Sequence, residues 1–291
     1  MKRLALHTLA AACLAVAVGP AFATASSSAV VGNLIITLTD LNLADGILPS
    51  LSFVPNSIPG LHNEAKGWGD VSESYTRDDY ASAPSRYGTL SRQLDTAWST
   101  SSGSVTTAAN AAGYTAMSAQ GSARSGLDGY GKYFSQSYTG NNVSEFKLSA
   151  NTQVTFSIMA DLKANTSMGY NLDADIAEYG HARVLLNVGG TIDGMWQNDA
   201  AERGVLAEYY VRDDNTVSGV SDSWSGLMSV SFSNTGSTAA DAWLQGVALS
   251  EGQSAIWDGV SPVPEAETYA MMLAGLALIG AARRRKGGNV C

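Results

Sequence analysis

The sequence predicts an all-β protein, an antiparallel β-sandwich of the jelly-roll kind. Apolar and polar residues alternate in several short runs, and this period of two is typical of strands with one buried face. Glycine, asparagine, aspartate and serine separate the runs, as turn residues do. Helical periodicity is scarce between the two chain ends, where the alanine-rich stretch 108–119 fits either helix or strand. Many short strands joined by turns favour a sandwich.

The alternating runs are each expected to form one strand. The clearest of them occupy residues 34–39, 154–162, 184–188 and 228–232. Further strands are expected near residues 66–75, 104–120, 129–138, 142–149, 203–212 and 240–250. Turn-forming residues lie between them at 45–46, 139–142, 189–190, 213–215 and 234–236. We see neither a repeat nor an internal linker, so one β-domain is expected over 26–249, followed by a spacer at 250–262.

The first 25 residues are predicted to be a secretory signal peptide. Lys2 and Arg3 precede an apolar run at 4–18, and Ala23 and Ala25 supply the small residues of a cleavage site. The run is short for a stable membrane-spanning helix. We therefore expect export through the Sec translocon and removal of residues 1–25 by signal peptidase.

A second apolar segment lies close to the C-terminus. Residues 269–282 carry no charge, and a basic cluster follows at once, made of Arg283, Arg284, Arg285 and Lys286. At about 1.5 Å per residue a helix of this segment would be about 21 Å long, against about 30 Å for the hydrocarbon core of a bilayer. The cations are expected to stay in the cytoplasm. The segment is thus predicted to be a single short hydrophobic helix that anchors the exported domain transiently in the inner membrane.

The end of the chain resembles the PEP-CTERM sorting signal of Gram-negative bacteria. Val263, Pro264 and Glu265 precede the apolar segment and its basic cluster, and Ala266 stands where that family carries a second proline. In the family, an integral-membrane exosortase reads this tail and is thought to cleave near the Pro-Glu-Pro element. The resemblance implies that Val263, Pro264 and Glu265 form the processing element, that the basic cluster stops transfer, and that 263–287 is the sorting and anchor segment.

Removal of both ends changes the composition of the exported protein. The whole chain has 17 Lys+Arg and 26 Asp+Glu, a formal net charge of -9. Without residues 1–25 and 265–291 the net charge falls to -13, and both cysteines, Cys13 and Cys291, are lost. The exported domain is therefore expected to depend on its core and not on disulfides. Its acidity argues against nucleic acid as a partner.

No catalytic residue is predicted, and we expect that the protein is not an enzyme. The exported domain has no G-x-S-x-G sequence, and only His62 and His181 could serve there as imidazole bases. Two histidines without cysteine do not make a typical zinc site. Residues 126–132 match G-x-x-x-x-G-K, but Tyr133 follows where a phosphate loop needs serine or threonine, so the segment is interpreted as a glycine-rich hairpin. The many carboxylates single out no glycosidase pair.

Two acidic segments leave calcium binding open. Residues 40–46 and 171–175 place aspartate and asparagine at alternate positions, as calcium loops do, but neither continues into the EF-hand pattern. The same residue types are common turn formers. No cofactor is therefore predicted, with calcium as the open alternative.

The aromatic residues also leave two interpretations open. All 6 tryptophans lie between the predicted cleavage sites, and Trp68 is accompanied by Tyr75, Tyr80 and Tyr87 in one polar stretch. Tryptophan and tyrosine favour strands and cores, which is the commoner role. Exposed members could instead form a platform for sugars.

These observations predict a non-enzymatic protein of the cell surface or extracellular matrix. The PEP-CTERM resemblance implies sorting by an exosortase and an association with exopolysaccharide and biofilm formation. Two alternatives stay open, a carbohydrate-binding or adhesive module and a secreted polysaccharide hydrolase. The expected partners are the Sec translocon, signal peptidase, an exosortase-type protease and exopolysaccharide.

Overall fold

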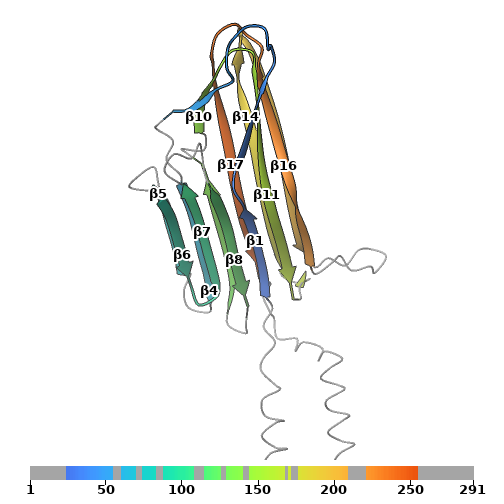
Figure 1. Ribbon diagram of the computed structural model, residues 1–291. Coiled ribbons are helices and arrows are strands. Elements are labelled where there is room, and N and C mark those ends of the chain that lie inside the picture. Colours follow the sequence, from blue (N-terminus) through green and yellow to red (C-terminus); the bar gives the residue numbers. More distant parts are fainter. Residues whose placement is uncertain are drawn as a thin grey trace, which may run out of the picture. The chain divides into compact units, whose positions relative to one another are not determined.

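The computed structural model describes ten stretches of the chain, all within the unit Phe22–Trp257. They are residues 24–54, 60–69, 74–82, 88–107, 115–125, 129–139, 144–167, 170–171, 176–208 and 221–254. All regular secondary structure in these stretches is β-strand (Figure 1). The predicted all-β, antiparallel fold is therefore confirmed. The predicted signal peptide, apart from its last two residues, and the predicted C-terminal helix lie outside the described residues.

Seven strands form the first sheet, called sheet A. Their order from one edge to the other is β16, β11, β1, β8, β7 and β6, and β2 also pairs with β11, beyond the end of β1. Their bounds are Thr24–Val31 for β1, Ile35–Asp40 for β2, Gly88–Asp95 for β6, Ser99–Thr107 for β7, Ala116–Arg124 for β8, Thr152–Thr166 for β11 and Ser221–Asn234 for β16.

Eight strands form the second sheet, called sheet B. Their order is β15, β14, β17, β9, β4 and β5, with β10 paired to β17 and β3 paired to β10. Their bounds are Leu51–Phe53 for β3, Gly60–Gly69 for β4, Ser74–Ser82 for β5, Gly129–Tyr138 for β9, Ser144–Leu148 for β10, Tyr179–Ile192 for β14, Met195–Glu208 for β15 and Ala240–Gln253 for β17. A separate small ladder joins β12, Tyr170–Asn171, to β13, Ile176–Ala177.

The two sheets face each other as the layers of a sandwich. Contacts between the layers join β16 to β15, β11 to β14, β1 to β14 and β17, β8 to β9, β7 to β4 and β6 to β5. Each strand of sheet A thus faces the strand at about the same place in the order of sheet B, across the core. Each broad outer face of the domain is therefore one side of a sheet, with every second residue of its strands turned to that face.

The core changes in character along the strands. Where β2 pairs with β11, large aromatic side chains fill it, and the ring centroid of Phe146 lies 5.4 Å from that of Phe156 and 6.2 Å from that of Phe232. Where β1 pairs with β11, small residues such as Ala25 and Ala29 face the opposite sheet. The second region is called the small-residue half of the core. Its shorter side chains let the two layers approach closely.

Strands β15 and β1 differ from the sequence-based expectation because their alternation is weak. β15 begins at Met195, not near 203, and its first residues are mostly exposed, since it is an edge strand held to β14 by backbone hydrogen bonds. β1 begins at Thr24, inside the segment expected for the signal peptide, and three of its four inward side chains are alanine or serine.

Two further expected strands each divide into parts of two strands. Residues 66–75 hold the end of β4 and the start of β5, and residues 104–120 hold the end of β7 and the start of β8. Of the stretch compatible with helix or strand, residues 116–119 are strand and 108–114 lie outside the described residues. In each case the expected strand had covered the end of one strand, the start of the next and the residues between them.

Candidate functional site

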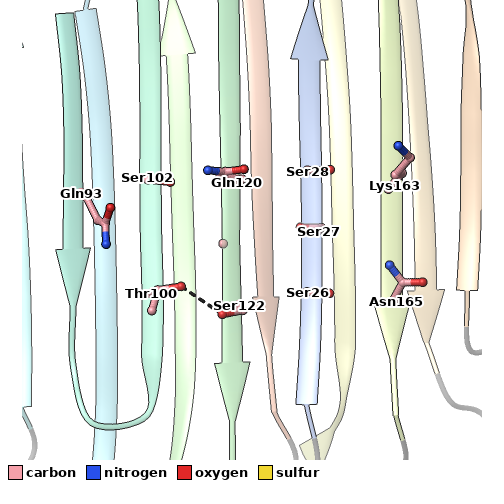
Figure 2. A pocket seen from close by; sticks show the side chains of 11 residues that line it. Ser26, Ser27, Ser28, Gln93, Thr100, Ser102, Gln120, Ser122, Lys163 and Asn165 are labelled. Carbon is pink, nitrogen blue, oxygen red and sulfur yellow. Dashed lines mark hydrogen bonds between the residues drawn. The ribbon is translucent and has the colours of Figure 1, made fainter.

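A shallow groove with a volume of about 410 Å³ lies on the outer face of sheet A. Figure 2 shows its side chains, which come from five adjacent strands, β6, β7, β8, β1 and β11. One row across these strands consists of Thr100, Ser122, Ser26 and Asn165. The next row consists of Gln93, Ser102, Gln120, Ser28 and Lys163. We call these two rows the hydroxyl lattice.

The antiparallel register explains why these side chains form rows. Residues directly opposite each other on neighbouring strands point to the same face, and neighbouring strands lie about 4.8 Å apart. Along each strand the next residue on that face lies two positions away, about 7 Å. The strand sequences place serine, threonine, glutamine, asparagine or lysine at these positions and alanine, serine or glycine between them. A flat array of hydrogen-bonding groups results.

Hydroxyl groups in this array pair across the strands. Thr100 Oγ1 lies 2.9 Å from Ser122 Oγ, the contact dashed in Figure 2. Next to the groove on the same face, Ser104 Oγ lies 2.8 Å from Ser118 Oγ. A hydroxyl can donate one hydrogen bond and accept two, so one such pairing leaves each group able to bond a ligand.

The charge of the groove is small. Among its described lining residues Lys163 carries the only formal charge, and its Nζ lies 3.0 Å from Oδ1 of Asp161 on the same strand. Both side chains are partly exposed, so this ion pair adds little to stability, but the carboxylate offsets the ammonium charge. The groove is therefore better suited to an uncharged, hydroxyl-rich ligand than to a polyanion.

A buried hydrogen-bond network supports the lattice from below. Ser27 lies between Ser26 and Ser28 and points inward, where its Oγ is 2.9 Å from the Tyr133 hydroxyl and 2.7 Å from Ser250 Oγ. Burial raises the pKa of the Tyr133 phenol well above its ordinary value of 10.0, so this group stays protonated at neutral pH. The network joins β1 of sheet A to β9 and β17 of sheet B directly behind the groove.

Other inward serines bond the backbone of the facing sheet. Ser101 Oγ donates to the Phe134 carbonyl at 2.6 Å, and Ser137 Oγ donates to the Ser118 carbonyl at 2.6 Å. Ser135 Oγ approaches both the Ser102 carbonyl and Asn63 Oδ1 at 2.7 Å. A buried hydroxyl without a partner would be costly, and these carbonyls satisfy it. The lattice thus rests on a layer that is fixed by cross-sheet hydrogen bonds.

Sequence reasoning missed the groove and the network. The surface and buried positions carry the same residue type, and Ser26, Ser27 and Ser28 are consecutive. The one usable signal is serine at every second position, as in Ser99 and Ser101 or Ser135 and Ser137. This signal does not say which face of the strand is buried.

The predicted sorting and processing residues lie outside the described residues. These are Val263, Pro264, Glu265, Arg283, Arg284, Arg285, Lys286 and the first cleavage residue, Ala23. The second cleavage residue, Ala25, is buried in β1 and faces sheet B. Within the described ranges, no helix has the length and apolar composition needed to cross a membrane.

The first acidic segment has local hydrogen-bond partners. Asp40 Oδ1 accepts from the backbone N–H of Asn42, Asp45 Oδ1 accepts from the N–H of Ile47, and Asp45 Oδ2 accepts from the Asn151 amide at 2.7 Å. Contacts of an aspartate side chain with a backbone N–H two residues further on are typical of turn-forming residues. Of the second segment, only the Asn171 backbone is described, and among all described residues no group of three His, Cys, Asp or Glu is placed to hold a metal ion.

The remaining sequence candidates lie apart from one another. His62 is on β4 and His181 is on β14, with β9 and β17 between them in sheet B. His181 Nδ1 is 3.0 Å from Glu251 Oε1. Residues 129–132 of the G-x-x-x-x-G-K segment belong to strand β9, and Tyr133, which follows them, is buried. The hairpin interpretation is wrong, because β8, the strand before the segment, lies in sheet A while β9 lies in sheet B, and the two strands do not pair.

The described tryptophans are divided between the core and the surface. Trp224 is half-buried near Arg203, Trp98 and Trp243 are half-buried, and Trp196 is 62% exposed. The side chains of the 68–87 stretch and Trp257 lie outside what the structure describes.

One comparison with known proteins identifies the C-terminal segment. The family model of the PEP-CTERM protein-sorting motif matches residues 262–286, which confirms the resemblance noted there. No curated protein matches the chain. The chain therefore combines a β-sandwich with a PEP-CTERM sorting motif, and this motif implies an exported, surface-directed protein processed by an exosortase-type system.

Proposed function

We propose that this protein is a non-enzymatic component of the cell surface or extracellular matrix whose sandwich contacts exopolysaccharide. In this proposal the Sec translocon exports the chain and signal peptidase removes its N-terminal segment. The apolar segment at 269–282 holds it briefly in the membrane until an exosortase processes it near Pro264 and Glu265. The sorting motif supports the destination, and the hydroxyl lattice supports the polymer contact.

The chemistry of the lattice favours a polymer over a small ligand. Hydroxyl and amide side chains both donate and accept hydrogen bonds, as sugar hydroxyls do. Each such bond contributes about 1 kcal/mol once the competing bonds to water are counted. A shallow groove surrounds a single sugar poorly, so affinity must come from many weak bonds along a chain. A neutral, extended polysaccharide meets this requirement because its repeat can contact several strands at once.

Cell fractionation with intact mass measurement tests the sorting part of the proposal. Glu265→Ala is expected to leave the C-terminal segment attached and the protein in the membrane fraction. The matched control is Glu267→Ala, which removes the same charge two residues further on and is expected to give the wild-type mass and fraction. Identical masses and fractions for Glu265→Ala and the wild type would contradict processing at this element.

Retention by polysaccharide tests the contact part. A Gln120→Ala, Asn165→Ala double variant removes two of the three amides of the lattice, one on its central strand β8 and one on β11, while Ser229→Ala changes a hydroxyl on the same sheet outside the groove. The double variant is expected to lose retention on a neutral polysaccharide gel, and Ser229→Ala to keep it. Equal retention of all three proteins would contradict a role for the groove.

A further inference from the structure

Two tryptophan side chains meet on the outer face of sheet B. The ring centroids of Trp196 on β15 and Trp243 on β17 lie 6.2 Å apart, with an interplanar angle of 32°. Trp196 is 62% exposed, although tryptophan is usually largely buried. We call this pair the tryptophan shelf. It leaves a large aromatic surface in contact with solvent, on the opposite layer from the hydroxyl lattice.

The strand between the two tryptophans carries a glycine beneath the shelf. β14 lies between β15 and β17, and Gly189 is directly opposite Trp243 in the register. A Cβ atom at Gly189 would lie 2.8 Å from Cζ2 and 3.0 Å from Cε2 of Trp243, so any side chain there would displace the indole. The missing side chain therefore lets the indole lie over the backbone of β14, with its other face turned away from the sheet.

Polar groups border the shelf without a large net charge. Lys147 Nζ and Asp241 Oδ1 form an ion pair at 2.7 Å, and Asp241 is two residues before Trp243 on the same face. Asn198 on β15 lies opposite the glycine of β14, and Glu145 on β10 lies opposite Trp243. Lys147 is paired with Asp241, and Glu145 leaves these groups with a net negative charge, so an anionic polymer would be repelled. An uncharged ligand with hydroxyl groups would find both donors and acceptors.

We infer that the tryptophan shelf is a second glycan contact, which stacks on the pyranose rings of an uncharged polysaccharide. An aromatic face carries partial negative charge and a large apolar area. A pyranose ring presents C–H groups on one face and hydroxyl groups around its rim, which matches an indole bordered by amide and charged side chains. Exposed tryptophan also dominates many binding surfaces because it is rigid and large. This inference rests on the proposed function, since it names a further surface through which the domain meets polysaccharide.

Affinity electrophoresis of the full chain tests the shelf. The protein is kept in a polyoxyethylene detergent, which contains no sugar, and is run in native gels containing hydroxyethyl cellulose, dextran or alginate. The wild type is expected to be retarded by at least one of the two neutral polymers and not by alginate. Trp196→Ala is expected to weaken the apparent affinity for that polymer about tenfold, the usual scale for truncating a dominant contact residue. Leu227→Ala, at a residue that is 60% exposed on sheet A, is the matched apolar control and should migrate like the wild type.

A second variant probes the shelf without removing either tryptophan. Gly189→Val is expected to displace the Trp243 indole and to reduce retardation. A separate variant, Trp196→Phe, keeps an aromatic ring and should retain part of the retardation. Thermal melting of each variant shows whether the domain is folded, and exposed Trp196 is not needed for the core. Equal retardation of the wild type and folded Trp196→Ala would overturn the inference.

The outcomes separate this inference from the proposed function. If Trp196→Ala binds like the wild type but the groove variant does not bind, the shelf is overturned and the polymer contact through sheet A stands. If none of the three polymers retards the wild type, the shelf and the polysaccharide contact are both overturned. Sorting to the surface is judged independently by the fractionation of Glu265→Ala.

Discussion

Ser27 in sheet A and Tyr133 in sheet B join the two layers through hydroxyl oxygens that lie 2.9 Å apart. Ser250 completes the contact, since its Oγ donates to the Ser27 carbonyl at 2.9 Å. These groups occupy the small-residue half of the core, where few large apolar side chains are present. In this half of the core, hydrogen bonds between the layers therefore provide part of the stabilisation that phenylalanine packing provides in the other half.

Tyr133→Phe is expected to lower the free energy of unfolding by about 1 kcal/mol, the usual net contribution of one buried hydrogen bond. The ring stays in place, so only the hydroxyl contact with Ser27 is lost. Denaturant unfolding followed by tryptophan fluorescence measures the change. Thr100→Val, which removes a hydroxyl at the surface of the same region, is expected to change stability by much less. An unchanged midpoint for Tyr133→Phe would contradict a stabilising role for the contact.

Gly121→Ala is expected to destabilise the domain by about 2 kcal/mol, because overpacking a well-filled core forces side chains or backbone to move. A Cβ atom at this position would overlap the ring of Tyr133. The same substitution at Gly32 is the control, since a Cβ there meets nothing closer than 3.7 Å. Thermal melting compares the two variants. Similar melting temperatures for both would show that the layers can separate at Gly121 without cost.

Glu251→Gln is expected to lower stability at pH 6 and to have a smaller effect below about pH 4. A hydrogen bond from His181, helped by the charges of His181 and Arg183, holds the pKa of Glu251 below its ordinary value of 4.5, against the opposing effect of burial. The unfolded chain takes up a proton near 4.5 and the folded chain only at lower pH. The stabilisation is therefore complete above 4.5 and disappears as pH falls through the lowered folded-state pKa. Melting curves of both proteins across this range measure it, and a difference that stays constant would contradict it.

The mature chain is expected to begin at Thr24, with signal peptidase cutting after Ala23. β1 lies inside sheet A between β11 and β8, and Thr24 pairs there with Arg124 and receives a hydrogen bond from Ser167 N–H at its carbonyl. Ala25 is buried between the layers. Cutting after Ala25 would remove two residues of this central strand. Intact mass measurement of protein recovered from the medium distinguishes the two sites, and a chain that begins at Ser26 would contradict the prediction.

Asp199→Ala is expected to promote self-association with little loss of stability. Asp199 Oδ2 on edge strand β15 accepts from the Ser231 N–H of edge strand β16 at 2.7 Å, and so occupies a backbone donor that would otherwise be open to another chain. Exposed edge strands pair readily with other molecules. Light scattering during storage measures association. Asp241→Ala makes the same charge change on a strand inside sheet B and should stay monodisperse, whereas equal behaviour of both variants would contradict edge protection.

The strands with large apolar residues could be predicted from the sequence. Alternation at 154–162 and 228–232 marks parts of β11 and β16, and the inward side chains there include Phe156 and Phe232. Such side chains bury enough apolar surface to decide which face of a strand turns inward. The first part of β15 gave no such signal, because an edge strand can be held by backbone pairing alone. Strand β1 was not predicted because three of its four inward side chains are alanine or serine.

The C-terminal signal was determined by the sequence alone. A sorting motif is a short linear pattern, so residues 262–286 could be interpreted without a fold, and the family comparison confirms them. The tertiary structure decided which serines form the groove and which join the layers. Ser26 and Ser28 line the groove and Ser27 is buried, although the three residues are chemically identical. Small polar side chains carry too little apolar area to show their orientation locally, so only pairing with strands distant in the sequence sets it.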